Sequence, residues 1–384
     1  MSAQQPDPTD PAVPAAALDE ALQPLADLSL PMLVSQAEQL QNDGHGQAAV
    51  NLYRLWLAHS QQPHQPLAWF NLGALLQRMG ETGQAIAAYR QCLARDPGVA
   101  QAHINLGLSL ERLGQHEDAL NAWGALLARR YQSPPPEAEM LTTALNHIGR
   151  LQENQRRYQQ AEQALEASLQ INPRQPGVIQ HWVHIRQKAC AWPVYKPLEH
   201  ISLGELMRAT SPLAMIALSD DPAVLLQNAQ SFVHRTYSLA QEHLSEGRVY
   251  QHAKRRIGYV SGDLREHAVG FLLPRFVKAH DRERYELYAY DFTPDDRSLH
   301  RQGLLAQFDH VRSIHQLDDR QAAQCVLDDE IDILIDLHGL SSGARPGIFA
   351  LHPAPRQGTY LGFIGSTAMP WLDFVLADKP MKPR

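Results

Sequence analysis

The hydrophobic residues of this chain follow one pattern in its first half and another after Arg256. Before residue 190 they lie in Ala-rich stretches of helical sequence, whereas from Arg256 short apolar runs alternate with helical segments. The first pattern predicts an all-helical region. The second predicts a parallel, doubly wound sheet covered by helices on both faces. The predicted fold is therefore a helical array followed by a Rossmann-like α/β domain.

The second half contains the individual elements of that sheet. Helical sequence fills 203–245, where Ser211-Pro212 and Asp221-Pro222 mark helix starts because proline costs little at the first helical position. Predicted strands then cover 257–261, 285–290, 310–312, 331–337, 360–364 and 374–377, and predicted helices cover 271–280, 298–308 and 320–327.

A repeat governs the first half. Asn71-Leu72-Gly73 and Asn105-Leu106-Gly107 are 34 residues apart, and so are Tyr89 and Trp123. A period of 34 with small residues where helices meet is typical of tetratricopeptide repeats, which are helix-turn-helix units that stack into a superhelix. Such a superhelix has a concave groove that normally holds another protein. We therefore expect Asn71, Asn105 and Asn146 to line a peptide-binding groove.

A third unit follows the first two at a longer spacing. Gly107 to Gly149 and Ala119 to Ala161 are each 42 residues, so a single insertion of eight fits both. The segment 130–136 contains Pro134-Pro135-Pro136 and cannot continue a helix, which predicts a loop there. A stretch from Gly46 resembles the second helix of an earlier unit, and 177–190 is predicted to form a capping helix.

Composition limits the classes of function. The 384 residues carry a formal net charge of −7, which gives no general attraction to nucleic acid. No apolar run is long enough to span a bilayer and no signal sequence opens the chain, so we expect a cytoplasmic protein. Three scattered cysteines fit a reducing compartment and exclude a cysteine-only metal site. The predicted domains are a mobile tail at 1–27, repeats at 28–190, a helical connection at 191–254 and the α/β lobe at 255–384.

Three glycine-containing loops should meet at the carboxyl edge of the sheet, where such folds bind ligands. They run over 262–270, 338–345 and 365–368, and each adds a titratable or hydroxyl side chain to its glycines. Small residues are also what strand-to-helix turns require. Ligand binding and simple turn formation are about equally good explanations for any one of these loops.

Several motifs in fixed order resemble one known family. The repeats are followed by 256–263, His267, Gly343-Ala344-Arg345, Pro353-Ala354-Pro355 and 361–366. This arrangement is similar to the O-linked N-acetylglucosamine transferase and SPINDLY family. The resemblance implies an inverting, metal-independent transfer of sugar from a nucleotide donor to Ser or Thr of proteins, by two Rossmann-like lobes. It also implies that the repeats hold protein or peptide acceptors.

The resemblance assigns His267 as the candidate general base, because a neutral imidazole can take the proton of an attacking hydroxyl. The alternative is a solvated histidine paired with Glu266. Asp263 is expected to orient the loop through hydrogen bonds to backbone N–H groups. His338 either contacts the acceptor or braces its loop. Arg345 either pairs with Asp336 or Asp263 in a buried ion pair or attracts an anionic donor.

The remaining loop and the donor are less closely defined. Gly365, Ser366 and Thr367 resemble the family's stretch near the donor, although Ile364 replaces a proline. Ala268-Val269 after the histidine is closer to the bacterial SPINDLY-like branch, so the donor is a UDP-sugar or a GDP-sugar, with fucose as the alternative to N-acetylglucosamine. No additional cofactor or metal is expected.

The resemblance also implies a second Rossmann-like lobe, which is expected to be absent from this chain. Two hypotheses follow: a glycosyltransferase that needs the complementary lobe, or a non-catalytic scaffold whose repeats bind partners. A lobe without its partner should expose apolar surface around Leu361, Phe363 and Trp371. We therefore expect self-association or a partner that supplies the missing lobe.

Overall fold

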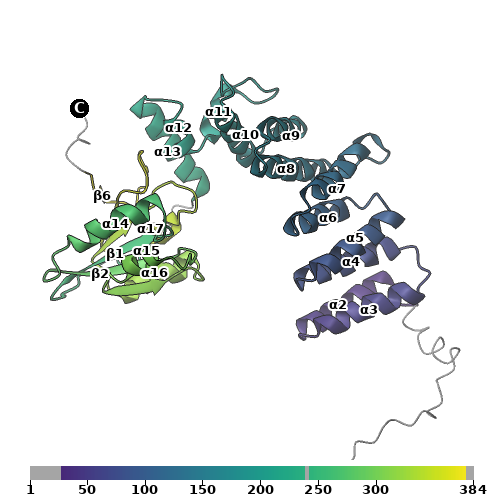
Figure 1. Cartoon of the computed structure of the whole chain (residues 1–384), viewed down its shortest axis with the longest axis horizontal. Coiled ribbons are helices and arrows are strands. Elements are labelled where there is room, and N and C mark those ends of the chain that lie inside the picture. The colour runs from purple at the N-terminus through teal and green to yellow at the C-terminus, as the bar shows by residue number, and fades with distance from the viewer. Residues whose placement is uncertain (1–26, 238–241, 378–384) are drawn as a thin grey trace, which may run out of the picture. The chain divides into compact units, whose positions relative to one another are not determined.

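The computed structural model describes residues 27–237 and 242–377. They form two compact units, one ending at Val194 and including Leu198–His200, the other beginning at Ile201 and including Tyr195–Pro197 (Figure 1). Of the tail predicted at 1–27, only Asp27 lies within the described residues.

The first unit consists of helix pairs joined by short turns, as the repeat predicts. The helices are α2 (Leu30–Asn42), α3 (Gly46–His59), α4 (Gln65–Arg78), α5 (Thr82–Arg95), α6 (Ala100–Arg112), α7 (His116–Ala128), the short 3₁₀ helix η1 (Arg129–Tyr131), α8 (Ala138–Asn154), α9 (Tyr158–Ile171) and α10 (Pro176–Lys188). The predicted loop at 130–136 separates α7 from α8, and the predicted capping helix is α10.

Small residues set how closely the two helices of a repeat approach. A Cβ at Gly107 would lie 2.2 Å from Nε1 of Trp123, and one at Gly73 would lie 2.6 Å from the ring of Tyr89. Glycine is required at these positions because the aromatic ring of the second helix occupies the space of a side chain. The repeated glycine in the sequence is therefore a packing contact.

The turns within the repeats share one backbone conformation. Gly44, Gly80 and Gly114 all have positive φ, between 75° and 83°, and Arg156 takes the same place between α8 and α9 with φ 60°. Glycine adopts this left-handed region without steric cost, whereas a side chain there is strained. The turn between α8 and α9 keeps this geometry although it has an arginine in place of the glycine.

The second unit is a six-stranded parallel sheet with helices on both faces. Its strands are β1 (Arg255–Ser261), β2 (Tyr285–Asp291), β3 (His310–Ser313), β4 (Ile333–Asp336), β5 (Arg356–Thr359) and β6 (Phe374–Val375). Its helices are α11 (Leu203–Ala209), α12 (Pro212–Ile216), α13 (Pro222–Thr236), α14 (Ala268–Lys278), α15 (Leu299–Leu305), α16 (Asp319–Asp328) and α17 (Pro346–Ala350). The strand order is β3-β2-β1-β4-β5-β6, and every pairing is parallel, which confirms the predicted fold class.

One predicted strand is wrong. Residues 360–364 form a loop, and the strand before it is β5. Leu361 has φ 68°, and a Cβ at Gly362 would lie 1.8 Å from the carbonyl oxygen of Leu337. The apolar run that suggested a strand is bent sharply against the end of β4.

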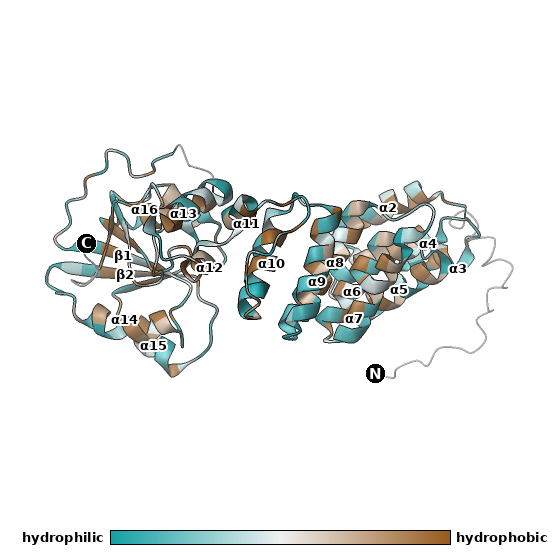
Figure 2. Cartoon of the chain, turned by 90° about the horizontal axis from the view of Figure 1, so that it is seen from above, coloured by the Kyte–Doolittle hydropathy of each residue, from teal (hydrophilic) through white to brown (hydrophobic). Residues whose placement is uncertain are grey.

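The helices of 203–236 belong to the sheet unit. Ser211 and Asp221 cap α12 and α13 at the prolines that predict their starts. Val233 and Ala229 of α13 are buried in one apolar cluster with Val260 of β1 and Leu334 of β4. Figure 2 shows hydrophobic residues along the strands of this sheet and a mixture of hydrophobic and hydrophilic residues along its helices.

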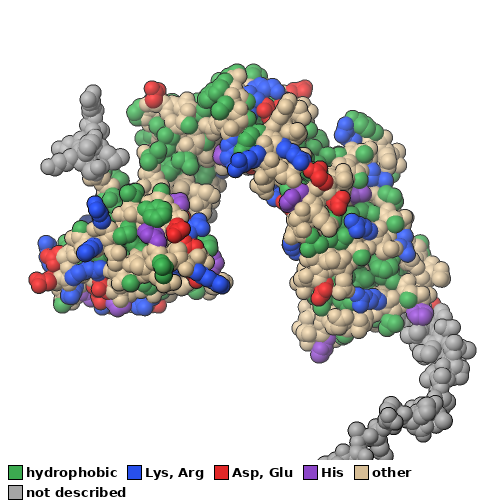
Figure 3. All heavy atoms as spheres, viewed as in Figure 1, with side chains coloured by type: hydrophobic (Ala, Val, Ile, Leu, Met, Phe, Trp, Pro, Cys, Tyr) green, Lys and Arg blue, Asp and Glu red, His purple; other side chains and the backbone are tan. Residues whose placement is uncertain are grey.

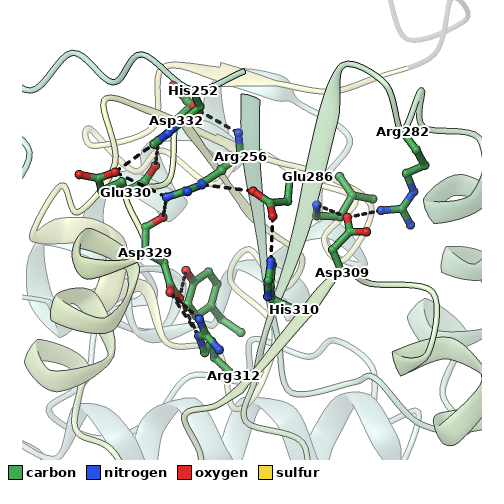
Figure 4. A network of polar contacts seen from close by, with 12 residues as sticks. His252, Arg256, Arg282, Glu286, Asp309, His310, Arg312, Asp329, Glu330 and Asp332 are labelled. Carbon is green, nitrogen blue, oxygen red and sulfur yellow. Dashed lines mark hydrogen bonds and ion pairs between the residues drawn. The ribbon is translucent and has the colours of Figure 1, made fainter. Parts of the chain in front are cut away.

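The amino edge of the sheet holds a network of charged side chains (Figure 4). Arg256 contacts Glu286 at 3.2 Å, and Glu286 contacts His310 at 2.8 Å, which links the starts of β1, β2 and β3. Arg312 binds Asp329 through two nitrogens, and Tyr290 donates to the same carboxylate. The basic and acidic side chains of this edge pair with one another, so we infer that the network stabilises the fold.

Candidate functional site

The candidate site lies at the carboxyl edge of the sheet, where the strand order reverses. β1 pairs with β2 on one side and with β4 on the other, so the loops after β1 and β4 leave the sheet in adjacent positions. Doubly wound sheets bind ligands in the crevice at such a switch point. Two of the three predicted loops, 262–270 and 338–345, begin there.

The first loop carries His267 to the start of α14. Its side chain caps that helix, since Nδ1 accepts from the N–H of Val269 at 3.4 Å. The side chain is 43% exposed. A Cβ at Gly270 would lie 2.0 Å from the carbonyl oxygen of Arg265, so glycine lets the loop fold back on the first turn of the helix. The imidazole is therefore held in a defined place and still open to solvent.

His338 joins the second loop to the first from inside the protein. Its Nε2 accepts from the N–H of Gly262 at 2.9 Å, and its Nδ1 lies 3.0 Å from Oγ of Ser341. The residue is 4% exposed. Burial lowers the pKa of this imidazole, although the nearby Asp263 carboxylate acts in the opposite direction. The buried ring favours the predicted bracing role over contact with an acceptor.

The end of β2 holds the same loop from the other side. Leu264 donates to Oγ1 of Thr293 at 3.0 Å, and Glu266 donates to Asp296 at 3.1 Å. Arg301 donates to the carbonyl oxygen of Leu264 and forms a buried ion pair with Asp291. Sequence reasoning missed these supporting residues, because no motif marks them. Their one sequence signal is position, just after the strand that neighbours β1.

Asp263 lies between the two histidines. Its Oδ2 is 3.4 Å from Nδ1 of His267 and 3.4 Å from Nε2 of His338. The contacts found for this carboxylate are therefore to side chains, and not the backbone N–H groups that we expected it to bind. Nor does His267 pair with Glu266, since its acidic neighbour is Asp263. The side-chain exposure falls from 43% at His267 to 15% at Asp263 and 5% at His338.

Asp336, at the end of β4, supports the second loop. Its carboxylate accepts from the N–H groups of His338 at 2.9 Å and Gly339 at 2.8 Å, and from the Thr359 hydroxyl at 3.4 Å. Burial raises the pKa of Asp336 to about 6, and the hydrogen bonds oppose that shift. The loop-orienting role that we expected of Asp263 is filled by Asp336.

Arg345 has other hydrogen-bond partners than the carboxylates we expected. It donates to Asp319 at 2.8 Å and to the carbonyl oxygens of Ile314 and Leu317, and it is 16% exposed at its side chain. The prediction of an ion pair with Asp336 or Asp263 is wrong, because the turn before α17 carries Arg345 to the start of α16. Each of its three nitrogens donates one of these bonds, so this arginine braces the turn before α17 against the region around α16.

The third loop packs on the second. A Cβ at Gly339, which has φ 59°, would lie 2.3 Å from Cβ of Phe363 and 3.3 Å from Cγ2 of Thr367. Gly365 packs close to Ile216 of α12, and Ser366 is exposed. These contacts place Gly365, Ser366 and Thr367 beside the His338 loop.

The predicted apolar surface is only partly present. Trp371 is 3% exposed and belongs to the core, so it does not contribute to that surface. Leu361 and Phe363 are half-buried, whereas their neighbour Ile364 is 75% exposed and Val375 is 67% exposed. Figure 3 shows basic and acidic side chains mixed over the visible faces of both units.

Asn71, Asn105 and Asn146 lie in the other unit, on α4, α6 and α8. Asn105 donates to the Tyr89 hydroxyl at 3.3 Å, and Asn71 makes the corresponding bond with Tyr53 one repeat earlier. Asn146 donates to Gln175 at 3.1 Å, and its side-chain oxygen is buried without a protein partner. The three amides thus join neighbouring helix pairs and are half-buried.

The described residues contain neither a cluster of metal ligands nor a membrane-spanning helix. Within 27–237 and 242–377, no three His, Cys, Asp or Glu side chains are placed to hold a metal ion. In the same ranges, no helix combines the length and the apolar character that crossing a bilayer demands.

Parts of both units match models of known protein families. Residues 215–384 match the model of glycosyl transferase family 41. Residues 70–135 and 142–175 match tetratricopeptide repeat models. The second unit carries a family 41 glycosyltransferase segment. The predicted resemblance to the O-linked N-acetylglucosamine transferase and SPINDLY family is confirmed by these matches and by the relatives below.

The curated relatives carry corresponding names. The chain is 27% identical over 219 residues to the probable UDP-N-acetylglucosamine–peptide N-acetylglucosaminyltransferase SEC of Arabidopsis thaliana, covering 52% of this chain and 22% of that protein. It is 34% identical over 129 residues to the Caenorhabditis elegans UDP-N-acetylglucosamine–peptide N-acetylglucosaminyltransferase, covering 33% of this chain and 11% of that protein. The Oryza sativa subsp. japonica protein named SPINDLY is 30% identical, over 33% of this chain and 14% of its own length. The chain spans less than a quarter of the length of each of these relatives.

Solved structures give weaker matches. A mutant of the Thermobaculum terrenum O-GlcNAc transferase is 24% identical with a TM-score of 0.41, covering 95% of this chain and 55% of that one. A MamA double mutant is 16% identical with a TM-score of 0.37, covering 50% of this chain and 97% of that one. The tetratricopeptide repeats that match in the first unit indicate protein–protein interaction.

Proposed function

We propose that this chain is the acceptor-side part of a protein O-glycosyltransferase. Its reaction transfers N-acetylglucosamine from a UDP-sugar to a Ser or Thr hydroxyl. The observation that carries the proposal is the position of His267 within the segment that matches family 41: an exposed imidazole at the start of α14, at the switch point of the sheet. A complementary lobe on another chain or on a longer protein completes the donor site.

In the proposed mechanism, His267 acts as the general base. Its imidazole takes the proton of the acceptor hydroxyl, and the hydroxyl oxygen forms a bond to the anomeric carbon of the sugar. The bond between that carbon and the nucleotide diphosphate breaks, and the diphosphate leaves with the electron pair. The configuration at the anomeric carbon is inverted in this single displacement. Ser366 and Thr367 lie near the donor, and the repeats hold the acceptor polypeptide at Asn71, Asn105 and Asn146.

A scaffold function is the second candidate, and the tetratricopeptide array favours it, because repeats of this kind bind proteins. In that case the repeats recruit a partner and the sheet unit performs no chemistry. Both candidates place the protein in the cytoplasm, without nucleic acid or a membrane as a partner.

Transfer of labelled sugar to a Ser/Thr peptide library tests the proposal. The assay uses UDP-N-acetylglucosamine and GDP-fucose as separate donors, with this chain alone and with the carboxyl-terminal lobe of a family 41 protein added. We expect His267→Ala to lower turnover by about 100-fold or more. His234→Ala changes an exposed histidine on α13 and should leave turnover unchanged. Peptide binding without any transfer or nucleotide affinity would support the scaffold function instead.

A further inference from the structure

The histidine that carries the proposed function must hold its proton on a particular nitrogen. An imidazole that acts as a base through Nε2 must carry its resting proton on Nδ1, and a hydrogen-bond acceptor beside Nδ1 decides this tautomer. Two groups lie beside Nδ1 of His267: the N–H of Val269 at 3.4 Å and the carboxylate of Asp263, also at 3.4 Å. The first favours a lone pair on Nδ1, and the second favours a proton there.

We propose that Asp263 is a positioning residue that accepts the Nδ1–H of His267 and leaves Nε2 free to take a proton from the acceptor hydroxyl. This inference builds on the proposed function. It also assigns a purpose to His338, which is to hold the Asp263 region of the loop in place without using its charge. The three residues then form an ordered series from solvent to interior.

The hydrogen bonds of His338 explain why Asp263 serves His267 alone. The N–H of Gly262 points at Nε2 of His338, so that nitrogen carries a lone pair. The proton of the neutral ring is then on Nδ1 and is donated to the Ser341 hydroxyl. Although Nε2 of His338 is 3.4 Å from the Asp263 carboxylate, it has no proton to offer. Burial, which lowers the pKa of His338, keeps the ring in this neutral state.

The competing contact of His267 is the weaker one. The two contacts have the same length, 3.4 Å, so the distance does not separate them, but a hydrogen bond to a carboxylate is roughly twice as strong as a neutral one. The Asp263 side chain is 15% exposed, so solvent screens this interaction only in part. The charge of the Asp263 carboxylate and its low exposure both favour the tautomer with the proton on Nδ1.

The loop is also rigid enough for a carboxylate to control one ring. It is bound to the end of β4 by the Gly262 to His338 bond and to the end of β2 by the Leu264 to Thr293 and Glu266 to Asp296 bonds. Asp263 itself donates its N–H to Oγ of Ser261 at 3.0 Å. Its carboxylate is therefore presented from a backbone that is fixed on both sides.

Nuclear magnetic resonance of the full chain, labelled with ¹⁵N at the histidine rings, tests the proposal directly. The His267 signals are identified by their loss in His267→Ala. We expect the wild-type chain to show mainly the Nδ1–H tautomer, and Asp263→Asn to convert the majority to Nε2–H. A wild-type spectrum with mainly Nε2–H overturns the proposal, and His267→Ala is needed only to identify the signals.

Asp296→Asn is the matched control. It weakens the acceptor of a bond that braces the same loop, the one from the N–H of Glu266, by removing its charge, as Asp263→Asn does beside His267, but Asp296 is no partner of His267 among the described contacts. This variant should keep the Nδ1–H tautomer. A change equal to that in Asp263→Asn would mean that loop order, and not the carboxylate, sets the ring, which contradicts the proposal.

Activity separates this inference from the function on which it builds. Where transfer is measured, Asp263→Asn should lower kcat by about 10- to 100-fold with little change in the KM for the acceptor. Transfer that survives in His267→Ala contradicts the proposed function, while the tautomer measurement still decides the role of Asp263. Loss of transfer in His267→Ala with an unchanged tautomer in Asp263→Asn contradicts the positioning role alone.

Discussion

At the scale of single residues, the site depends on buried groups that titrate in opposite directions. The pKa of Asp336 is raised to about 6 by burial, so the native state binds a proton that the unfolded chain has already released between pH 4 and 6. His338 has a lowered pKa, so the unfolded chain binds a proton that the native state refuses below its usual value. Asp336 therefore destabilises the fold as the pH rises, and His338 destabilises it as the pH falls.

Asp336→Asn isolates the first of these effects. In the unfolded chain this carboxyl ionises around its usual pKa of 3.8, so its destabilising contribution is small at pH 4 and nearly complete at pH 7. We expect the stability of the variant relative to wild type to rise by up to about 3 kcal/mol from pH 4 to pH 7. Urea unfolding at both pH values measures this. Asp220→Asn, at an exposed position, should show no such trend. An equal difference at both pH values would mean that Asp336 ionises as an ordinary carboxyl.

The residue scale is also where prediction from sequence was weakest. His267, Asp263 and His338 could be selected from their loops, because the carboxyl ends of parallel strands share an edge. Their partners could not, since the contact from His338 to Gly262 spans 76 residues and the one from Arg345 to Asp319 spans 26. Such contacts depend on where a turn directs a side chain, which local patterns do not encode.

At the scale of helices and strands, prediction from the sequence succeeded where the spacing of residues reflects how the helices pack. The period of 34 in Gly73 and Gly107 corresponds to glycines that face Tyr89 and Trp123 across a helix pair. The prolines after Ser211 and Asp221 mark helix starts that the structure confirms. The strand predicted at 360–364 was wrong because the chain bends sharply there against the end of β4, and the pattern of apolar residues alone does not separate a bent loop from a strand.

Two alanine substitutions test the packing role of the repeat glycines. At Gly107 a Cβ would overlap the Trp123 ring at 2.2 Å, so Gly107→Ala should destabilise the array by about 1–3 kcal/mol. Gly124 lies within α7 with no atom within 4 Å of the added Cβ. Gly124→Ala should therefore stabilise it by about 0.5–1 kcal/mol through helix propensity. Thermal unfolding followed by circular dichroism gives both signs. Equal effects of the two changes would show that Gly107 is not a packing contact.

At the scale of the whole molecule, the two units have separate cores. One apolar cluster runs through the helices of the array from Leu33 to Leu151, and two others fill the two faces of the sheet. The helices of 203–236 belong to the second group, since Ala229 and Val233 are buried with strand residues. Each unit therefore has its own source of stability, and the proposed site lies entirely within the second.

This division predicts that a core mutation in one unit leaves the stability of the other unchanged. Val233 is fully buried in the sheet unit, so Val233→Ala should lower the stability of that unit by about 2 kcal/mol through lost contacts and a cavity. Gly107→Ala should act on the array alone. Hydrogen exchange through a urea series, resolved by peptide with mass spectrometry, reports the unfolding of residues 30–190 and 203–377 separately. We expect each substitution to shift the midpoint of one set of peptides. A common shift of both sets would show that the units unfold as one cooperative body, in which case the array would sense the state of the site that we propose for catalysis.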